Sequence, residues 1–329
     1  MLEIATERGY EKSPSWHIIF EWEDDFSKDL QAPLFFMKNS VIMRLKKMVR
    51  SKLGINIRFR YSPRKPKFGI SMNAFYTDKH KVDGVIPYIL DFHIDALEKV
   101  YQETLDLPCF FVSCLDIYNR MKALHPDAKC YFLPQCVSDR YLNDTFPTKS
   151  IDVIQYGRKN PVLHKYMLKY CQDNPEVTYV FLGESGYIKS DGEFFGKFET
   201  RDAFISFIQS AKIALVSSPG VDFEQSLKNG MRTFGENIDF FTARFYECAA
   251  SYCYMIGRYT ENEEATRINI ASVCDNVKSY DEFRKLVDIY LHNASFSKYE
   301  VYREFIKNNS TSARAKEIKR VLEECNVLV

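Results

Sequence analysis

Residues 235–257, GENIDFFTARFYECAASYCYMIG, decide the fold prediction, because two carboxylates stand eight residues apart in a mostly apolar stretch. The two acids are Asp239 and Glu247. Apolar side chains recur between them at helical spacings, which predicts a helix from near Asp239, a good N-cap residue, to near Ser251. On that helix the acids would lie about 80° apart and roughly 12 Å along the axis. Arg244, three residues before Glu247, would face the same side and could pair with its carboxylate or with a phosphate.

This stretch resembles the donor-site helix of the group 1 glycosyltransferases with the GT-B fold. Their signature is two glutamates eight residues apart, followed by an alanine-rich turn and a short strand. Asp239 and Glu247 take the places of the glutamates, and residues 253–256 correspond to the strand. The resemblance implies that Asp239 acts at the sugar and that Glu247 binds the ribose of the donor. Tyr252 stands where the family has glycine, so we expect the turn to be built differently.

The spacing by itself also fits an ordinary amphipathic helix with an aspartate N-cap and one solvated glutamate. Charged residues usually face water, so the spacing alone favours this simpler interpretation. The neighbouring motifs argue against it.

The composition is that of an ordinary globular protein. A length of 329 residues is comfortable for two domains of about 150 residues each. The formal net charge of +1 predicts no general affinity for nucleic acid. The N-terminus has no signal-peptide pattern and no apolar run reaches the ~20 residues that span a bilayer, so we expect a cytoplasmic protein. Nine cysteines without a C-x-x-C pair and six scattered histidines predict no disulfide framework, metal or other cofactor.

One segment departs from this neutral average. Residues 31–77 contain eleven Lys and Arg and no Asp or Glu. The first half predicts a helix with an apolar stripe from Leu34 to Leu53 and basic residues opposite, a pattern typical of helices at membrane surfaces. Residues 34–67 are therefore a candidate for contact with an anionic membrane at its inner face. The alternative is that the stripe packs on the protein's own sheet while the charges face water.

Strands and helices alternate in the N-terminal half. We expect strands at 16–22, 68–72, 85–90, 109–112 and 129–133, and helices at 94–101 and 114–124. Such alternation predicts parallel strands with functional loops beyond their carboxyl ends. Asp91 and His93 follow a strand at such a position, and we take them as candidate catalytic residues. The alternative for His93 is a partly buried side chain without a role in chemistry.

A second α/β unit begins with the strand Ile151–Gln155. Gly157, Arg158 and Lys159 then form a turn ahead of a helix capped by Asn160. A glycine turn at a helix N-terminus suits an anion, and the two cations strengthen it. The Gly-Arg pair resembles the diphosphate clamp of the same family, although a plain loop with a solvated arginine is the alternative. No G-x-G-x-x-G or Walker sequence is present, so NAD, FAD and P-loop sites are poorly supported.

Two loops complete the predicted donor site. The strand at 177–182 ends at Gly183, and in the family the loop at this point passes near the base. The strand at 213–217 is followed by Ser218, whose loop in the family faces the donor. A plain turn is the alternative for the second loop.

We therefore predict an α/β protein with the GT-B fold, in which two Rossmann-like domains face each other across a cleft. Residues 1–140 would bind the acceptor, residues 151–300 the nucleotide sugar, and helices in 301–329 would pack back on the first domain. The resemblance implies metal-independent transfer of a sugar, with retention of configuration, to a hydroxyl of a glycan or glycolipid in cell-surface polysaccharide synthesis. A nucleotide-sugar-binding module that has lost turnover and a nucleotide-sugar epimerase are the alternatives.

Overall fold

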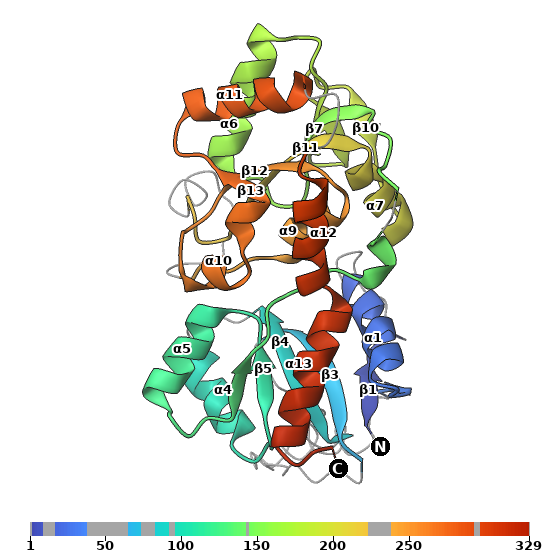
Figure 1. The fold of residues 1–329 in the computed structure, drawn as a ribbon, viewed down its shortest axis with the longest axis vertical. Helices are drawn as coiled ribbons and strands as arrows, with labels where there is room; N and C mark the ends of the chain where they lie inside the picture. Colours follow the sequence, from blue (N-terminus) through green and yellow to red (C-terminus); the bar gives the residue numbers. More distant parts are fainter. Residues whose placement is uncertain are drawn as a thin grey trace, which may run out of the picture. The chain divides into compact units, whose positions relative to one another are not determined.

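The computed structural model describes residues 2–8, 17–37, 65–73, 83–91, 96–142, 145–222, 238–292 and 297–328. The chain forms two compact units, Met1–Pro134 with Thr311–Val329, and Gln135–Ser310 (Figure 1). The change of unit between Pro134 and Gln135 comes before residue 140, where the sequence predicts the end of the first domain. The 3₁₀ helix η3 (Asp139–Tyr141) belongs to the second unit.

The first unit is built on a parallel sheet with the strand order β2-β1-β3-β4-β5-β6. The strands are β1 (Glu3–Thr6), β2 (Leu34–Phe36), β3 (Lys67–Asn73), β4 (Val85–Asp91), β5 (Phe110–Val112) and β6 (Cys130–Phe132). Strand β4 is largely apolar and buried, as parallel strands covered on both faces are. The chain returns from β2 across β1 to β3, so the switch point of this sheet lies between β1 and β3.

Two predictions for the start of the chain are wrong. Residues 16–22 were expected as a strand, but His17–Asp29 form helix α1, in which Ile19, Trp22 and Phe26 are buried at helical spacings. Leu34 was expected to begin a helix, but it begins β2, which pairs in parallel with β1. Residues 38–64 of the basic segment lie outside the described residues.

The C-terminal helix α13 (Thr311–Glu324) belongs to the first unit, together with α4 (Leu97–Thr104) and α5 (Leu115–Leu124). The Thr311 hydroxyl donates a hydrogen bond to Asp25 of α1 at 2.8 Å, and Ser312 donates to Asp29 at 2.7 Å. The prediction of a C-terminal helix that returns to the first domain is confirmed. Helix α12 (Tyr299–Asn308) instead packs on α9 in the second unit, so the predicted segment 301–329 is divided between the units.

The second unit contains a sheet with the order β10-β9-β8-β7-β11-β12-β13. Its strands are β7 (Ile151–Gln155), β8 (Tyr179–Leu182), β9 (Tyr187–Lys189), β10 (Phe194–Gly196), β11 (Ala211–Ser217), β12 (Tyr254–Arg258) and β13 (Cys274–Asn276). Strand β9 pairs antiparallel with both of its neighbours, β8 and β10, and the other neighbouring strands are parallel. The switch point lies between β7 and β11.

Helices cover both faces of this second sheet (Figure 1). One face carries α6 (Pro161–Asp173) and α11 (Tyr280–His292), and the other carries α7 (Arg201–Gln209), α9 (Ala243–Ala250) and α12. The short helices α10 (Glu263–Arg267) and η4 (Ile270–Ser272) precede β13. Each face has its own apolar core, so the carboxyl ends of β7, β11 and β12 are held on a rigid support.

Candidate functional site

The turn between β7 and α6 stands at the switch point of the second sheet. Gly157 has a φ of 66°, in the left-handed region that glycine adopts without strain. A Cβ added there would lie 3.5 Å from Cδ of Arg244. That distance is an ordinary van der Waals contact, so the left-handed backbone conformation, and not a lack of space, is what favours glycine here.

Asn160 caps α6, but it does so in a way that changes the predicted anion site. Its Oδ1 accepts hydrogen bonds from the backbone N–H groups of Val162 and Leu163, both at 3.0 Å. Pro161, at the first helical position, has no N–H to offer. The first donors of α6 are thus satisfied within the protein, so an anion at this turn would depend on side chains more than on the helix N-terminus.

Three cationic side chains gather around the turn. Nη1 of Arg244 donates to the Arg158 carbonyl oxygen at 2.9 Å. Burial lowers the pKa of Arg244, and the charge of Arg158 lowers it further. Burial also lowers the pKa of Lys159, whose Nζ lies 4.7 Å from the centre of the Phe181 ring. The described structure thus holds like charges close together, an arrangement that an anion would stabilise.

Glu247 lies on α9 with only 4% of its surface exposed. One carboxylate oxygen accepts a hydrogen bond from the Tyr156 hydroxyl at 3.1 Å, and the other pairs with Arg201, the first residue of α7. The carbonyl oxygen of Arg244 also lies 3.1 Å from the Tyr156 hydroxyl and shares its single proton with Glu247. Both oxygens therefore have a partner within the second unit, and each keeps a further lone pair for a ligand.

Asp239 is not on a helix. Helix α9 begins at Ala243 with Thr242 as N-cap, so the predicted helix from Asp239 and its 80° geometry are wrong. Asp239 accepts hydrogen bonds from the backbone N–H groups of Gly220 at 3.3 Å and Thr260 at 3.1 Å. Burial raises its pKa against these bonds. Asp239 thus joins the loops that follow β11 and β12.

The remaining predicted residues are spread over three places. Ser218 is buried, and its backbone N–H donates to the Arg258 carbonyl oxygen at 3.2 Å. Gly183 closes the turn after β8 by donating to Gly186 at 2.7 Å. Asp91 ends β4 of the first unit, but its side chain is not described, and His93 lies outside the described residues. The structure therefore places Arg158 and Arg244 next to each other, whereas Ser218 and Gly183 lie on separate loops of the second unit.

Sequence reasoning missed the residues that hold these loops in place. Arg201 pairs with Glu247, and Arg258, at the end of β12, pairs with Asp222 after β11. Each pair joins residues more than thirty positions apart, so no local pattern announces the contact. Arg258 directly after an apolar strand was the one usable signal.

Tyr252 forms the turn after α9. Its φ is 50°, in the left-handed region that glycine adopts without strain, so a tyrosine here holds a conformation that glycine usually takes at a helix end. The backbone N–H of Cys253 donates to Cys248 at 3.1 Å, and that of Tyr252 to Ala249 at 2.9 Å, as in a Schellman turn. The Tyr252 ring is buried and stacks on Tyr299, with ring centres 4.9 Å apart.

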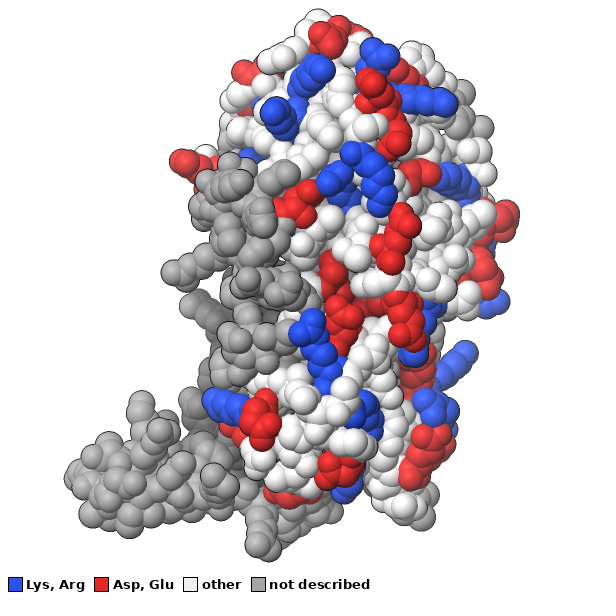
Figure 2. Space-filling model, turned by 90° about the vertical axis from the view of Figure 1, so that its left-hand side faces the viewer, with Lys and Arg blue, Asp and Glu red and all other residues white. Residues whose placement is uncertain are grey.

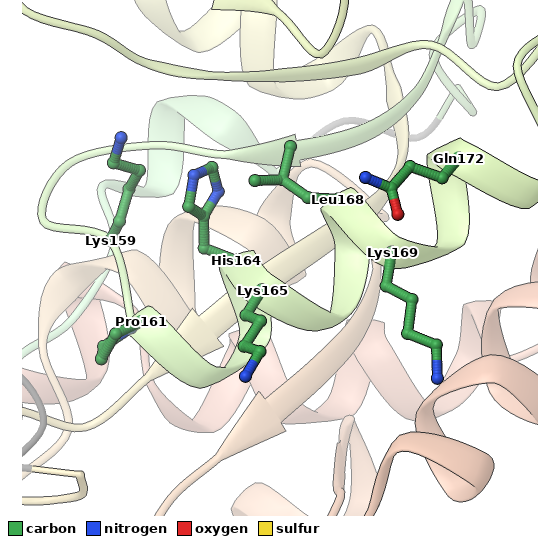
Figure 3. A pocket seen from close by; sticks show the side chains of 7 residues that line it. All are labelled: Lys159, Pro161, His164, Lys165, Leu168, Lys169 and Gln172. Atoms are coloured by element: carbon green, nitrogen blue, oxygen red, sulfur yellow. The ribbon is translucent and has the colours of Figure 1, made fainter.

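A cavity of about 700 Å³ runs along α6. It is lined by Lys159, Pro161, His164, Lys165, Leu168, Lys169 and Gln172. Lys159 and His164 point to one side of the helix, and Lys165 and Lys169 to the other (Figure 3). Burial and the charge of Lys159 lower the pKa of His164 to about 4, so this imidazole is neutral at pH 7. Lys159 is the residue that links this cavity to the turn.

The described residues contain no group of three or more His, Cys, Asp and Glu side chains placed to hold a metal ion. In the same ranges, no helix is both long and apolar enough to cross a membrane.

Comparison with known proteins gives a likeness of fold. No protein-family model matches the chain. No curated protein sequence is significantly similar to it. Solved structures do match, among them the pneumococcal O-GlcNAc transferase GtfA in complex with UDP and GlcNAc, at 12% identity and a TM-score of 0.53. This match covers 86% of the present chain and 60% of GtfA, so the chain spans about three fifths of the length of that relative.

Two further structures are similar. TarM of S. aureus, in a complex that contains UDP, matches at 10% identity and a TM-score of 0.53 over 78% of this chain and 55% of its own. A DNA-modifying β-glucosyltransferase, solved with and without uridine diphosphoglucose, matches at 13% identity and a TM-score of 0.50 over 99% of both chains. With two Rossmann-like units on parallel sheets and these neighbours, the chain has the GT-B fold.

Proposed function

We propose that this protein is a glycosyltransferase that moves a sugar from a nucleotide sugar to an acceptor hydroxyl without a metal ion. One observation carries the proposal. Arg158, Lys159 and Arg244 gather at the switch point of the second sheet, where open α/β sheets bind their ligands. A diphosphate is an anion whose charge these cations would offset.

The proposed reaction needs such a site. The acceptor oxygen forms a bond to the sugar's anomeric carbon, the bond from that carbon to the diphosphate breaks, and the nucleoside diphosphate leaves with the electron pair. Negative charge on the leaving group is greatest in the transition state, so Arg158 and Lys159 would stabilise it there more than in the bound donor. Retention of configuration is proposed on the family resemblance alone, and the anomer of the product measured by NMR would decide it.

Glu247 and Asp239 receive different parts in this proposal. Glu247 would accept hydrogen bonds from the ribose hydroxyls, using the lone pairs that are not bound to Tyr156 or Arg201. Asp239 would hold the loops after β11 and β12 in place. Its direct role at the sugar stays a prediction, and measuring the turnover of the Asp239→Asn variant tests it. Asp91 and His93 remain the predicted catalytic residues on the acceptor side, and Asp91→Asn tests whether a carboxylate there receives the acceptor's proton.

Thermal unfolding with a panel of nucleotides and nucleotide sugars tests the donor site. A donor at a hundredfold excess over Kd stabilises the folded protein by about 2.7 kcal/mol. We expect nucleoside diphosphates and their sugars to raise the Tm, and the Arg158→Ala variant to lose most of that rise. If no nucleotide of the panel raised the Tm of the wild-type protein, the proposed function would be abandoned.

Turnover separates the proposal from its two alternatives. A binding module of this fold would show the Tm rise but neither transfer nor hydrolysis of the donor. An epimerase would interconvert nucleotide sugars without an acceptor.

The acceptor is proposed to be a glycan or glycolipid, reached at an anionic membrane through residues 34–67. Each Lys or Arg near an anionic surface contributes about 1 kcal/mol, so four of the eleven would give measurable attachment. On the face shown in Figure 2, basic and acidic side chains are interspersed over the described residues. We expect sedimentation with anionic liposomes at low salt, and release at 0.5 M salt, where the Debye length is roughly 4 Å.

DNA is a second candidate acceptor, although the net charge predicts no general affinity for it. The observation that favours it is the match to a DNA-modifying glucosyltransferase over 99% of both chains. The basic segment would then meet phosphates of DNA instead of lipid head groups. Retarded migration of duplex DNA at low salt, without sedimentation on liposomes, would favour DNA. Charge reversal of Arg44, Lys46, Lys47 and Arg50 should abolish whichever binding is found.

A further inference from the structure

Asp222 binds groups from two other loop ends of the second sheet. It follows β11 by five residues, and its side chain is 6% exposed. One oxygen accepts from Nε of Arg258 at 2.6 Å and from Nδ2 of Asn160 at 2.9 Å, and the other accepts from Nη2 of Arg258 at 2.8 Å. A single carboxylate thus joins the carboxyl ends of β7, β11 and β12.

The backbone of Asp222 is strained. Its φ of 56° lies in the left-handed region, which costs a residue other than glycine free energy. Aspartate tolerates this region better than most side chains, but the conformation still has to be held by its surroundings. The three hydrogen bonds to Arg258 and Asn160 supply that hold.

Arg258 is occupied by this arrangement. Nε and Nη2 bind Asp222, and Nη1 donates to the carbonyl oxygen of Val277 at 3.1 Å. Its charge is balanced at close range by the Asp222 carboxylate. Although Arg258 stands beside the switch point, its described contacts assign it to the loops and leave the diphosphate to other cations.

Asn160 connects the carboxylate to the donor turn. Its Oδ1 caps α6 through Val162 and Leu163, while its Nδ2 binds Asp222, so both ends of the amide are fixed. The residue directly before it is Lys159, and the one before that is Arg158. The conformation of these two residues is therefore limited by a hydrogen bond that Asp222 accepts.

We propose that Asp222 is a positioning residue for the donor diphosphate, because it holds the turn that carries Arg158 and Lys159 in its binding conformation before the ligand arrives. The inference rests on the proposed donor site. A preformed arrangement of cations binds more tightly than one that the ligand has to order. Substituting Asp222 should thus weaken the binding of a nucleoside diphosphate more than the binding of a nucleoside monophosphate.

The test compares the Kd of UDP and of UMP for the full chain and three variants, measured by calorimetry. Asp222→Asn keeps the shape but removes the charge. Asn160→Ser keeps a helix cap but removes the donor to Asp222. The control variant is Asp275→Asn. Asp275 lies on β13 of the same unit and pairs with Lys298 at 3.0 Å, and the substitution breaks this ion pair.

We expect Asp222→Asn to raise the Kd of UDP by about tenfold or more and the Kd of UMP by much less, since a charge-assisted hydrogen bond is lost at the turn. Asn160→Ser should shift the ratio of the two affinities in the same direction with a smaller loss of Tm. Asp275→Asn should lower the Tm and leave the ratio unchanged.

Four outcomes overturn the inference. If Asp222→Asn and Asn160→Ser bound UDP as the wild type does, Asp222 would be structural while the proposed donor site stood. The same conclusion would follow if UDP and UMP weakened equally, or if Asp275→Asn changed their ratio as much. If neither UDP nor any other nucleoside diphosphate of the panel bound the wild-type protein, the proposed function and this inference would both be removed; if a different diphosphate binds, the test uses it together with its monophosphate.

Discussion

Two buried glutamates, one in each unit, show how differently a carboxylate can be accommodated. Glu247 on α9 is 4% exposed and Glu23 on α1 is 2% exposed. Glu247 engages both oxygens, one with Arg201 and one with Tyr156. Glu23 accepts both of its hydrogen bonds, from Thr6 at 2.6 Å and from Nε of Arg8 at 3.2 Å, on the same oxygen. Its other oxygen has no hydrogen-bond donor among the described residues.

The difference appears in the ionisation of Glu23. Burial raises the pKa of this carboxyl to about 7, against the hydrogen bond from Thr6 and the charge of Arg8. The free energy lost when the Glu23 carboxylate leaves water exceeds what two hydrogen bonds to one of its oxygens return. An arginine and a hydroxyl that bind separate oxygens stabilise a buried carboxylate more fully. A buried acid is therefore a stabilising feature only together with its partners, and the two glutamates should respond to the same substitution in opposite ways.

Glu247→Gln should have the largest effect. It leaves the guanidinium of Arg201, 13% exposed, without its carboxylate, and breaking one partner of a buried pair costs about 3–5 kcal/mol. The free energy of unfolding from urea denaturation measures this loss. If the variant folds, its affinity for the donor should also fall by about 1–3 kcal/mol, because a charged acceptor of hydrogen bonds is lost.

Glu23→Gln at pH 8 is the matched control for that measurement. At pH 8 Glu23 is mostly ionised, and burial makes this charged form unfavourable in the folded protein. Removing the charge should therefore leave the free energy of unfolding unchanged or raise it. Equal destabilisation by the two substitutions would show that the pairing with Arg201 and Tyr156 does not distinguish Glu247 from Glu23.

The pH dependence of stability sharpens the comparison. Glu23 has a folded pKa of about 7 against an ordinary value of 4.5, so the folded state keeps the proton that the unfolded state loses between these pH values. The free energy of unfolding should fall as the pH rises from 4.5 to 7, by about 3 kcal/mol in total, and then level off.

The difference between the wild type and Glu23→Gln isolates this contribution from all other titrating groups. The charged groups that act on Glu23 are Arg8 and Asp24, and both remain in the variant. A difference that stayed constant from pH 4.5 to pH 8 would mean that Glu23 titrates normally in the folded protein.

Arg158→Ala tests the cations near Glu247. We expect kcat/KM to fall about a hundredfold, or about 2.7 kcal/mol, because the leaving diphosphate is most charged in the transition state. Arg267→Ala is the control, since this exposed arginine forms an i,i+4 pair with Glu263 on α10. If activity survived while only the Tm of Arg158→Ala fell, Arg158 would have a structural role.

Local signals predicted the elements on which the second unit is built. The strand Ile151–Gln155 appears as expected, and so does α6, because Asn160 and Pro161 are strong start signals for a helix. Asp239 failed as a start signal because its carboxylate is used by the distant N–H groups of Gly220 and Thr260, while Thr242 begins α9.

Contacts between distant residues account for the other differences. Leu34–Phe36 is a strand because it pairs with β1. The spacing of apolar residues that suggested a helix cannot indicate a pairing with a distant strand. The pairing of Glu247 with Arg201 spans 46 positions, and that of Asp222 with Arg258 spans 36. Such pairs depend on how the sheet is assembled, so the strand, turn and helix that carry the candidate donor residues could be predicted from sequence, but the ion pairs around them could not.

The smallest predicted effect lies at the end of α9, the helix that carries Glu247. Tyr252 has a φ of 50°, a conformation in which glycine is unstrained and alanine is not. Tyr252→Ala and Tyr252→Gly both lose the stacking on Tyr299, so the difference between them reports the backbone alone. We expect the glycine variant to be more stable than the alanine variant by about 1 kcal/mol, measured by urea unfolding. Ala249→Gly, inside α9, should show the opposite order, with alanine favoured by about the same amount. If alanine were also favoured at position 252, Tyr252 would not hold the left-handed conformation, and α9 would have to end by a turn other than the Schellman turn described above.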